Sequence, residues 1–326
     1  MDERLSQTVL KDGTAVDLRL VMPPEPRWAD RMHCFLKHKG LPWQIHWLKA
    51  FDGQCDDLET RFYLLVANDE PISNVMTVET GGIGILGHVF TKPKWRQKGA
   101  AAILMKAACD DFARRDGTVL YLYTEYDSMP WRLYAKFGFE GFVANVGLMR
   151  WVRQPARLEA MLTGNGLRAR PARWSDWPLL ECLFLQPADD YVKNIGLKRF
   201  GVCDMEGAFL TLQERMQKIP GTRAAVLTNS HEMTVGFGTA MPLDDYMSDY
   251  LLVDLFARHG AEGGLPDLLQ ALDLPAGRPL LAVVDQAGAA RRRVLESIGF
   301  RSAGHLPGAL NKDVSKEDLH LLMRAG

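Results

Sequence analysis

The sequence predicts an α/β protein made of two related domains. Its 326 residues are about twice the length of a typical domain. The motif Arg-Trp-Ala-Asp at 27–30 returns as Arg-Trp-Ser-Asp at 173–176, and the pair Gly-Phe at 138–139 returns at 299–300. In each half, segments rich in β-branched residues alternate with segments of helical periodicity. Together these observations indicate a duplicated chain whose halves share one order of strands and helices.

The first half is predicted to begin with strands and then to alternate between helix and strand. The strands are expected at 62–67, 72–78, 83–91 and 119–124, and the helices at 100–115 and 130–137. The turn-prone sequence Asn-Asp-Glu-Pro at 68–71 separates the first two strands. Apolar side chains recur at helical spacing in 100–115, and Gly117 ends this helix. Asp30 is expected to cap a helix that begins at Arg31.

The second half repeats this order. Its strands are expected at 224–228, 234–241, 250–257 and 280–284, and its last helix at 287–298. Asp176 is placed to cap a helix over 177–183. Residues 153–165 are predicted to link a first domain at 1–152 to a second domain at 166–326.

Composition and charge exclude several classes of protein. The 39 basic and 40 acidic side chains leave a formal charge of -1, whereas proteins that bind nucleic acid or anionic membranes usually carry a basic surplus. No apolar segment approaches the roughly 18 residues that span a bilayer. The five cysteines form no Cys-x-x-Cys pair, which argues against a disulfide scaffold or a metal site. We therefore expect a cytoplasmic protein without nucleic-acid, membrane or metal partners, and composition does not predict its oligomeric state.

The turn between the third predicted strand and the first long helix is the strongest functional signal. Four basic residues lie at 92–98, and the helix begins after Gly99 with alanines and no acid in its first turn. Backbone N–H groups at a helix N-terminus lack internal partners and carry partial positive charge. The pattern is typical of a site for an anion such as a diphosphate. A solvated basic turn between a strand and a helix is the alternative interpretation.

This turn resembles the acetyl-CoA loop of the GNAT superfamily of N-acetyltransferases, whose pattern is Arg/Gln-x-x-Gly-x-Gly/Ala. Here the loop reads Arg-Gln-Lys-Gly-Ala-Ala at 96–101. A second landmark, Leu-Tyr-x-Lys-x-Gly-Phe, is present at 133–139, after Asp127 at a position where the family commonly has asparagine. The resemblance covers residues 1–150 and extends weakly to the second half. It implies two GNAT-like domains, each with a mixed, mostly antiparallel twisted sheet flanked by helices.

The resemblance implies an acetyl-CoA-dependent N-acetyltransferase that modifies a primary amine of a small molecule or a peptide. It implies that the strand before the loop splays from the strand at 119–124, and that the thioester enters this gap. The cofactor-binding residues that it implies are Val89, Phe90, Thr91, Arg96, Gln97, Lys98, Gly99, Ala100, Ala101 and Asp127. Tyr134 matches the family's general acid, which would protonate the leaving thiolate.

The base that would accept a proton from the amine is not evident from the sequence. Two carboxylates at strand ends, Glu79 and Glu125, are the candidates. His88 is expected to point to the face opposite Val89 and to be part of the buried structure.

The second half resembles a degenerate GNAT-like domain. Glu262 would place a negative charge among the N–H groups that should receive the diphosphate. Leu295 stands where the first half has Tyr134, and leucine cannot donate a proton. We expect this domain to support the first one, and whether it still binds a CoA-like ligand stays open.

Three other functions are open at this point. The chain could be a non-catalytic acyl-CoA sensor or scaffold, or an acyltransferase that uses another acyl donor. It could also be an aminoacyl-tRNA-dependent transferase, although the near-zero net charge does not favour tRNA binding.

Overall fold

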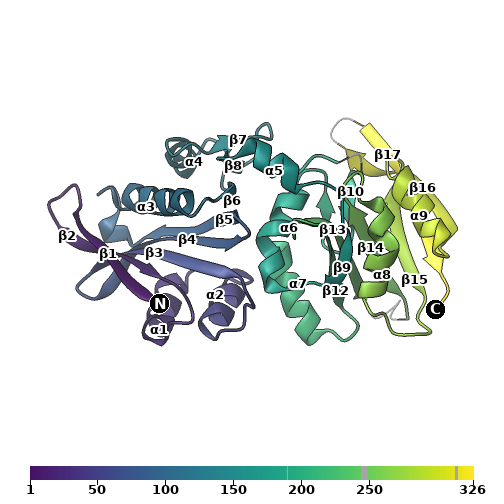
Figure 1. The fold of residues 1–326 in the computed structure, drawn as a ribbon, viewed down its shortest axis with the longest axis horizontal. Coiled ribbons are helices and arrows are strands. Elements are labelled where there is room, and N and C mark those ends of the chain that lie inside the picture. Colours follow the sequence, from purple (N-terminus) through teal and green to yellow (C-terminus); the bar gives the residue numbers. More distant parts are fainter. Residues whose placement is uncertain (189, 244–248, 313–314) are drawn as a thin grey trace. The chain divides into compact units, whose positions relative to one another are not determined.

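The fold comes from a computed structural model that describes all residues except 189, 244–248 and 313–314 (Figure 1). The chain forms two compact units. The first consists of Met1–Leu158 with Arg173–Leu179, and the second of Glu159–Ala172 with Leu180–Gly326. No helix in the described part is both long enough and apolar enough to cross a membrane.

The first unit is one eight-stranded sheet with helices on both faces. The strands lie in the order β1-β2-β3-β4-β5-β6-β8-β7, and only β5 and β6 run parallel. Figure 1 shows α3 and α4 over one face and α1 and α2 over the other. The strands are β1 (Asp2–Val9), β2 (Ala15–Val21), β3 (Glu59–Ala67), β4 (Glu70–Thr80), β5 (Ile83–Thr91), β6 (Val119–Tyr123), β7 (Glu140–Gly141) and β8 (Leu148–Val152). The helices are α1 (Pro26–Leu36), α2 (Trp43–Phe51), η1 (Pro93–Trp95), α3 (Ala100–Arg114), α4 (Met129–Ala135) and α5 (Pro155–Met161), which ends in the second unit.

Burial on both faces explains the sequence of the central strands. Almost every residue of β3 and β4 is buried, because helices cover the sheet from both sides. Helix α3 turns Leu104, Ala108 and Phe112 toward the sheet, and all three are fully buried. This rigid layer holds the loop between β5 and α3 in place. The mixed, mostly antiparallel sheet flanked by helices confirms the predicted fold class.

The parallel pair β5 and β6 separates before either strand ends. Residues Ile83–Ile85 pair with Val119–Tyr121, and no further pair follows. The register between β4 and β5 also shifts, since Met76 lies opposite Gly87 and Asn74 lies opposite Phe90. A β-bulge at this place bends β5 away from its neighbour and leaves a gap between β5 and β6.

The second unit contains a seven-stranded sheet in the order β16-β17-β15-β14-β13-β12-β9, and a separate two-stranded sheet. Its parallel pair, β14 and β15, is joined only at Leu251–Leu252 and Leu280–Leu281, so these strands separate as well. The strands are β9 (Arg168–Pro171), β10 (Val192–Asn194), β11 (Arg199–Phe200), β12 (Arg223–Thr228), β13 (Thr234–Pro242), β14 (Leu251–Ala257), β15 (Leu280–Asp285), β16 (Arg301–Lys312) and β17 (Ser315–Arg324). The helices are η2 (Trp174–Asp176), α6 (Trp177–Phe184), α7 (Glu206–Lys218), η3 (Glu262–Gly264), α8 (Leu265–Ala271) and α9 (Ala289–Ser297); η2 and the start of α6 belong to the first unit.

Two local expectations differ from the structure. Helix α1 begins at Pro26, so Asp30 lies inside the helix and does not cap it. Proline is favoured in the first turn because its missing N–H has no helical partner there. The expected linker at 153–165 contains helix α5, whose Leu158 and Met161 are buried. Burial of these side chains stabilises a helix where the sequence suggested only a connection.

Candidate functional site

The loop after β5 presents an uncapped helix start. Gln97 and Gly99 have φ values of 63° and 85°, in the left-handed region that favours glycine at the second position. No side chain in the described residues caps α3 at Gly99, and the first turn of α3 carries no acid. The first backbone N–H groups of α3 therefore keep their partial positive charge without an internal partner. This arrangement can bind an anion.

The turn between β1 and β2 supports this loop. The backbone N–H of Lys11 donates to the carbonyl oxygen of Lys98 at 3.1 Å, and the ammonium of Lys98 lies 2.8 Å from the carboxylate of Asp12. The hydrogen bond from Lys98 lowers the pKa of Asp12 to about 2. The side chain of Lys11 also lies against Gly99. This contact was not predictable from the sequence, because it joins the amino-terminal hairpin to a turn that is distant along the chain.

The remaining cations of the loop lie close to its surface. Arg96 donates to the carbonyl oxygen of Thr91 at 3.1 Å, which closes the turn after β5. Lys94 and Lys98 lie over the ring of Trp95, at 5.6 and 4.8 Å from its centre. Arg96 and Lys94 remain exposed, so they add positive charge beside the start of α3.

The end of β5 faces two different environments. Val89 packs against the core cluster beneath α3. Phe90 lies on the other face, with its ring 5.1 Å from Phe35 and 4.0 Å from His38. A cavity of about 440 Å³ opens beside Phe90, between α1 and the end of β5. Its lining includes Asp30, Cys34, Phe35, His38, Phe90 and Lys92.

Tyr134 and Asp127 lie in the segment after β6. The hydroxyl of Ser128 caps α4 by accepting the N–H of Trp131 at 3.3 Å. This cap places Tyr134 in the cluster beneath α3, where the side chain is 7% exposed. Asp127 is exposed and forms an ion pair with Arg132 at 3.1 Å.

The two expected carboxylates lie at different ends of the gap. Glu79 is 3% exposed, and both of its oxygens accept from Arg115, at 2.6 and 2.9 Å. It lies opposite Gly84, where β5 and β6 are still paired. Glu125 is exposed and follows β6, past the point where the strands separate. The structure therefore does not bring these two carboxylates together.

The structure adds His88 and its neighbours to the residues at the gap. His88 lies in the bulge of β5 with a φ of 50°, and its ring meets Trp43 and Trp47 edge-on at 5.7 and 5.1 Å. The amide of Asn74 donates to the carbonyl oxygen of His88 at 2.9 Å. The contact of these two tryptophans with the strand was not predictable from the sequence, because it depends on how α2 packs on the sheet.

In the second unit, an acidic side chain lies in the turn that corresponds to the loop before α3. The carboxylate of Glu262 accepts the backbone N–H of Gly260 at 2.7 Å, in the turn that leads to α8. Asp267 adds a second acid to the first turn of α8. Leu295, the counterpart of Tyr134, is 1% exposed. These acids reduce the attraction of this turn for a phosphate.

A hairpin formed by β10 and β11 lies across the separated strands of the second unit. The carboxylate of Asp254 on β14 accepts the N–H groups of Ile195 and Gly196, both at 3.0 Å. The carboxylate of Asp285, at the end of β15, accepts the N–H of Val192 at 2.7 Å. Because the hairpin is bonded to both strands, it bridges the gap between them.

The guanidinium of Arg291 reaches the same gap from α9. It donates to the carbonyl oxygen of Leu255 at 3.4 Å and lies 3.5 Å from Asp190. Leu255 lies beyond the last paired residue of β14. The side chain of Arg291 is 2% exposed, so the gap is filled at this point.

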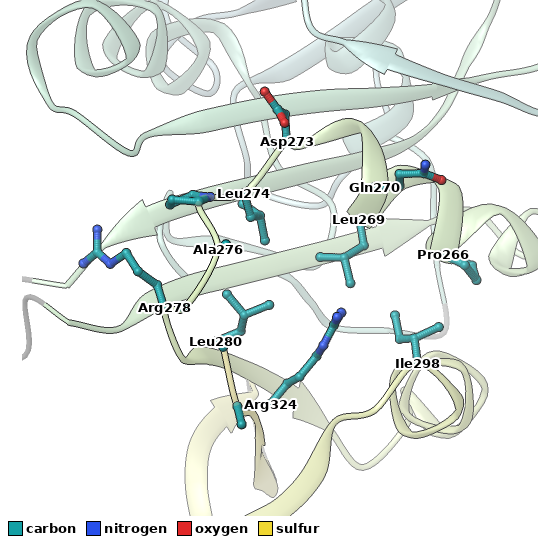
Figure 2. A pocket seen from close by; sticks show the side chains of 14 residues that line it. Pro266, Leu269, Gln270, Asp273, Leu274, Ala276, Arg278, Leu280, Ile298 and Arg324 are labelled. Atoms are coloured by element: carbon teal, nitrogen blue, oxygen red, sulfur yellow. The ribbon is translucent and has the colours of Figure 1, made fainter.

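A separate cavity of about 530 Å³ lies elsewhere in the second unit. Figure 2 shows Leu269, Leu280, Ile298 and Arg324 around it. Leu280 is the first residue of β15 and pairs with β14, so the cavity lies at the closed end of these strands. It is therefore not the counterpart of the loop before α3.

Comparison with known proteins finds similarity over part of the chain. Residues 28–139 match the model of the Acetyltransferase (GNAT) family. No curated protein matches the chain. Similar solved structures include an N-acetyltransferase from Staphylococcus aureus Mu50, 16% identical, with a TM-score of 0.41 over 49% of this chain and 99% of that chain. A ribosomal-protein-alanine N-acetyltransferase from Brucella melitensis is 18% identical, with a TM-score of 0.39 over 48% and 99%. A GNAT superfamily phosphinothricin acetyltransferase from Sinorhizobium meliloti, solved with acetyl-CoA, is 14% identical, with a TM-score of 0.39 over 49% and 88%.

Proposed function

Residues 28–139 form a domain of the GNAT acetyltransferase family, and on this basis we propose that the chain is an acetyl-CoA-dependent N-acetyltransferase. Its acceptor is a primary amine of a small molecule or a peptide. The observation that carries the proposal is the uncapped, acid-free start of α3, next to the gap between β5 and β6. A diphosphate fits such a helix start, and a narrow chain fits between separated strands.

Within this proposal, the loop holds the diphosphate of the cofactor. The N–H groups of Gly99, Ala100 and Ala101 point to it, and Arg96, Gln97 and Lys98 surround it. Small residues allow the phosphates to approach the backbone. Asp127 faces the cofactor only after it releases Arg132, so we assign it the weakest contact.

The free edge of β5 takes the thioester arm. Val89, Phe90 and Thr91 have no partner on β6. The carbonyl oxygens of Phe90 and Thr91 already accept from Ser73 and Arg96, so we propose that this edge bonds the amides of the arm through its remaining backbone groups, chiefly those of Val89. A backbone N–H aimed at the thioester carbonyl would stabilise the oxyanion that forms during attack. Tyr134 then protonates the departing sulfur as general acid.

Of the two carboxylates, we assign Glu79 a structural role and retain Glu125 as the candidate proton acceptor. The charged guanidinium of Arg115 holds both oxygens of Glu79. Glu125 is exposed at the open end of β6, where it can receive the proton of the amine through a water relay.

We further propose that residues 1–152 are the catalytic domain and 166–326 a degenerate GNAT-like domain without a cofactor. The acids near α8, the hairpin across β14 and β15, and the buried Arg291 support this assignment.

All five cysteines are free, which supports a cytoplasmic location.

The experiment that tests the function combines ligand binding with turnover. Acetyl-CoA should raise the melting temperature of the chain, and free thiol should appear when a panel of amines is added. Gly99→Glu places a carboxylate at the anion site and should abolish both effects.

Gly81→Glu is the matched control. Gly81 also has a positive φ, 59°, but it lies in the turn before β5 with open space around it. Its variant should keep the shift and the turnover. No shift of the unmodified protein at millimolar acetyl-CoA would refute the proposed function.

A further inference from the structure

We propose that His88 is the general base that accepts the proton of the attacking amine, and that the amine docks against Trp43 and Trp47. This inference rests on the proposed acetyltransferase function. In this inference His88, which lies at the gap, is the general base in place of Glu79 and Glu125.

In this proposal the thioester carbonyl lies beside His88, where β5 is no longer paired with β6. The last residue of β5 that pairs with β6 is Ile85, and His88 follows it in the bulge. Glu79 lies opposite Gly84, four residues earlier, which is about 13 Å along an extended strand. His88 is thus much closer than Glu79 to the open part of the gap.

His88 and Tyr134 belong to opposite faces of the sheet. The ring of His88 contacts Trp43 and Trp47 of α2, whereas Tyr134 packs in the cluster beneath α3. Val89 also packs in that cluster, so the α3 face at the end of β5 is filled by the core. An amine must attack the carbonyl from one side while the thiol leaves on another. A base and an acid on different faces suit this geometry.

The imidazole of His88 is available as a base. Burial, together with the nearby charges of His46, Lys39 and His38, lowers its pKa well below the ordinary histidine value, so the ring is neutral at pH 7. No hydrogen bond to its ring nitrogens occurs among the described residues, and the side chain keeps an exposed fraction of 8%. His46 differs, because its Nε2 is bonded to Thr60 at 3.0 Å and its Nδ1 is fully buried.

The two tryptophans explain how an amine would be held beside this base. The ring of Trp47 is fully buried and that of Trp43 is half-buried, so Trp43 offers a surface to a ligand. Aromatic faces attract ammonium groups and the apolar carbons next to them. Asn74 fixes the bulge by its bond to the carbonyl of His88 and acts as a positioning residue.

The proton and electron movements balance without a further reactant. The lone pair of the free amine forms the C–N bond with the thioester carbonyl carbon, and one N–H proton passes to the imidazole of His88. The C–S bond breaks, its electron pair leaves with sulfur, and Tyr134 supplies the proton that makes the free thiol. Water then carries the proton from His88 to Tyr134. A weak base suffices, because the nitrogen becomes more acidic as the C–N bond forms.

Removal and chemical rescue of the imidazole test this assignment. Glycine tolerates a φ of 50°, so His88→Gly should keep the bulge and leave a hole between the tryptophan rings. Turnover should fall about 100-fold, while acetyl-CoA still raises the melting temperature. Added imidazole should restore turnover, in proportion to its unprotonated fraction.

His46→Gly is the matched control, since it leaves a similar hole beside other tryptophan rings. Imidazole should not raise its turnover. If His88→Gly does not fold, His88→Asn replaces it, because asparagine tolerates a positive φ and carries no base. Unimpaired turnover of a folded His88 variant, or failure of imidazole to raise the turnover of His88→Gly, overturns the proposal. If the unmodified protein does not bind acetyl-CoA, the proposed acetyltransferase function itself is refuted instead.

Discussion

At the scale of single residues, Tyr134 is the side chain whose chemistry is easiest to isolate. Tyr134→Phe removes only the phenolic oxygen and keeps the ring in the cluster beneath α3. If this oxygen protonates the leaving sulfur, kcat should fall about 100-fold while the Kd for acetyl-CoA stays within about twofold. Steady-state kinetics and calorimetry measure the two quantities.

The control for this substitution is Tyr123→Phe. Tyr123 ends β6 and is 58% exposed, so the loss of its hydroxyl should leave kcat unchanged. A Tyr134→Phe variant as fast as the unmodified protein would remove Tyr134 from the mechanism.

Single residues also show which features of the site can be predicted from the sequence. The loop from Arg96 to Gly99 was predicted because its signal is local: a glycine, small neighbours and cations next to one another. The support that this loop receives from Lys11 and Asp12 could not be predicted, because it depends on how the first hairpin packs. His88 was expected on the face opposite Val89, and their contacts lie on opposite faces, but the role that we propose for it needs the tryptophans of α2.

At the scale of elements, the ion pair between Glu79 and Arg115 joins the end of β4 to the residue after α3. Glu79→Gln removes one of two buried carboxylates that hold this guanidinium, and Asp111 remains bonded to it at 2.9 Å. The free energy of unfolding should fall by about 2 kcal/mol, because hydrogen bonds between charged groups are lost but the guanidinium keeps a partner. Urea denaturation measures this loss, and kcat should not change, since Glu79 lies away from the bulge.

Glu59→Gln provides the comparison. Glu59 lies 3.8 Å from the same guanidinium but is 51% exposed, so its loss should cost less than about 1 kcal/mol. A large fall in kcat for Glu79→Gln, without a change in stability, would assign Glu79 a catalytic role instead.

Elements were predictable where the pattern was periodic. The strands from 62 to 91 and the helix after Gly99 appear where apolar spacing placed them. Strand β1 was missed, because its side chains are mostly exposed and show no alternation of apolar and polar residues. Helix α5 was missed because a short helix stabilised by tertiary burial has little signal of its own.

At the scale of the whole molecule, two halves with related strand orders should differ in ligand binding. Calorimetric titration with CoA should give one site per chain, because the turn before α3 is free of acids whereas Glu262 and Asp267 lie at the corresponding turn before α8. Gly99→Glu should reduce the number of sites to zero. Two sites in the unmodified chain, or one site that survives Gly99→Glu, would contradict the assignment of the second half.

The repeat was predictable from the sequence. The bridging of β14 and β15 by the hairpin and by Arg291 was not. Glu262 and Leu295 are the two residues from which the sequence predicts a degenerate second half. The positions of the β10–β11 hairpin and of the buried Arg291 depend on tertiary packing, which the sequence does not reveal.

The arginine and hairpin in the second gap are tethered to the sheet that they fill. An intramolecular occupant acts at a fixed effective concentration, in the millimolar range or above, whatever the supply of metabolites. A free acyl thioester would have to displace Arg291 and the hairpin, which remain covalently attached to the same domain. If the first half binds acyl-CoA as proposed, the cellular concentration of acyl-CoA should therefore change the ligand occupancy of the first half and not that of the second.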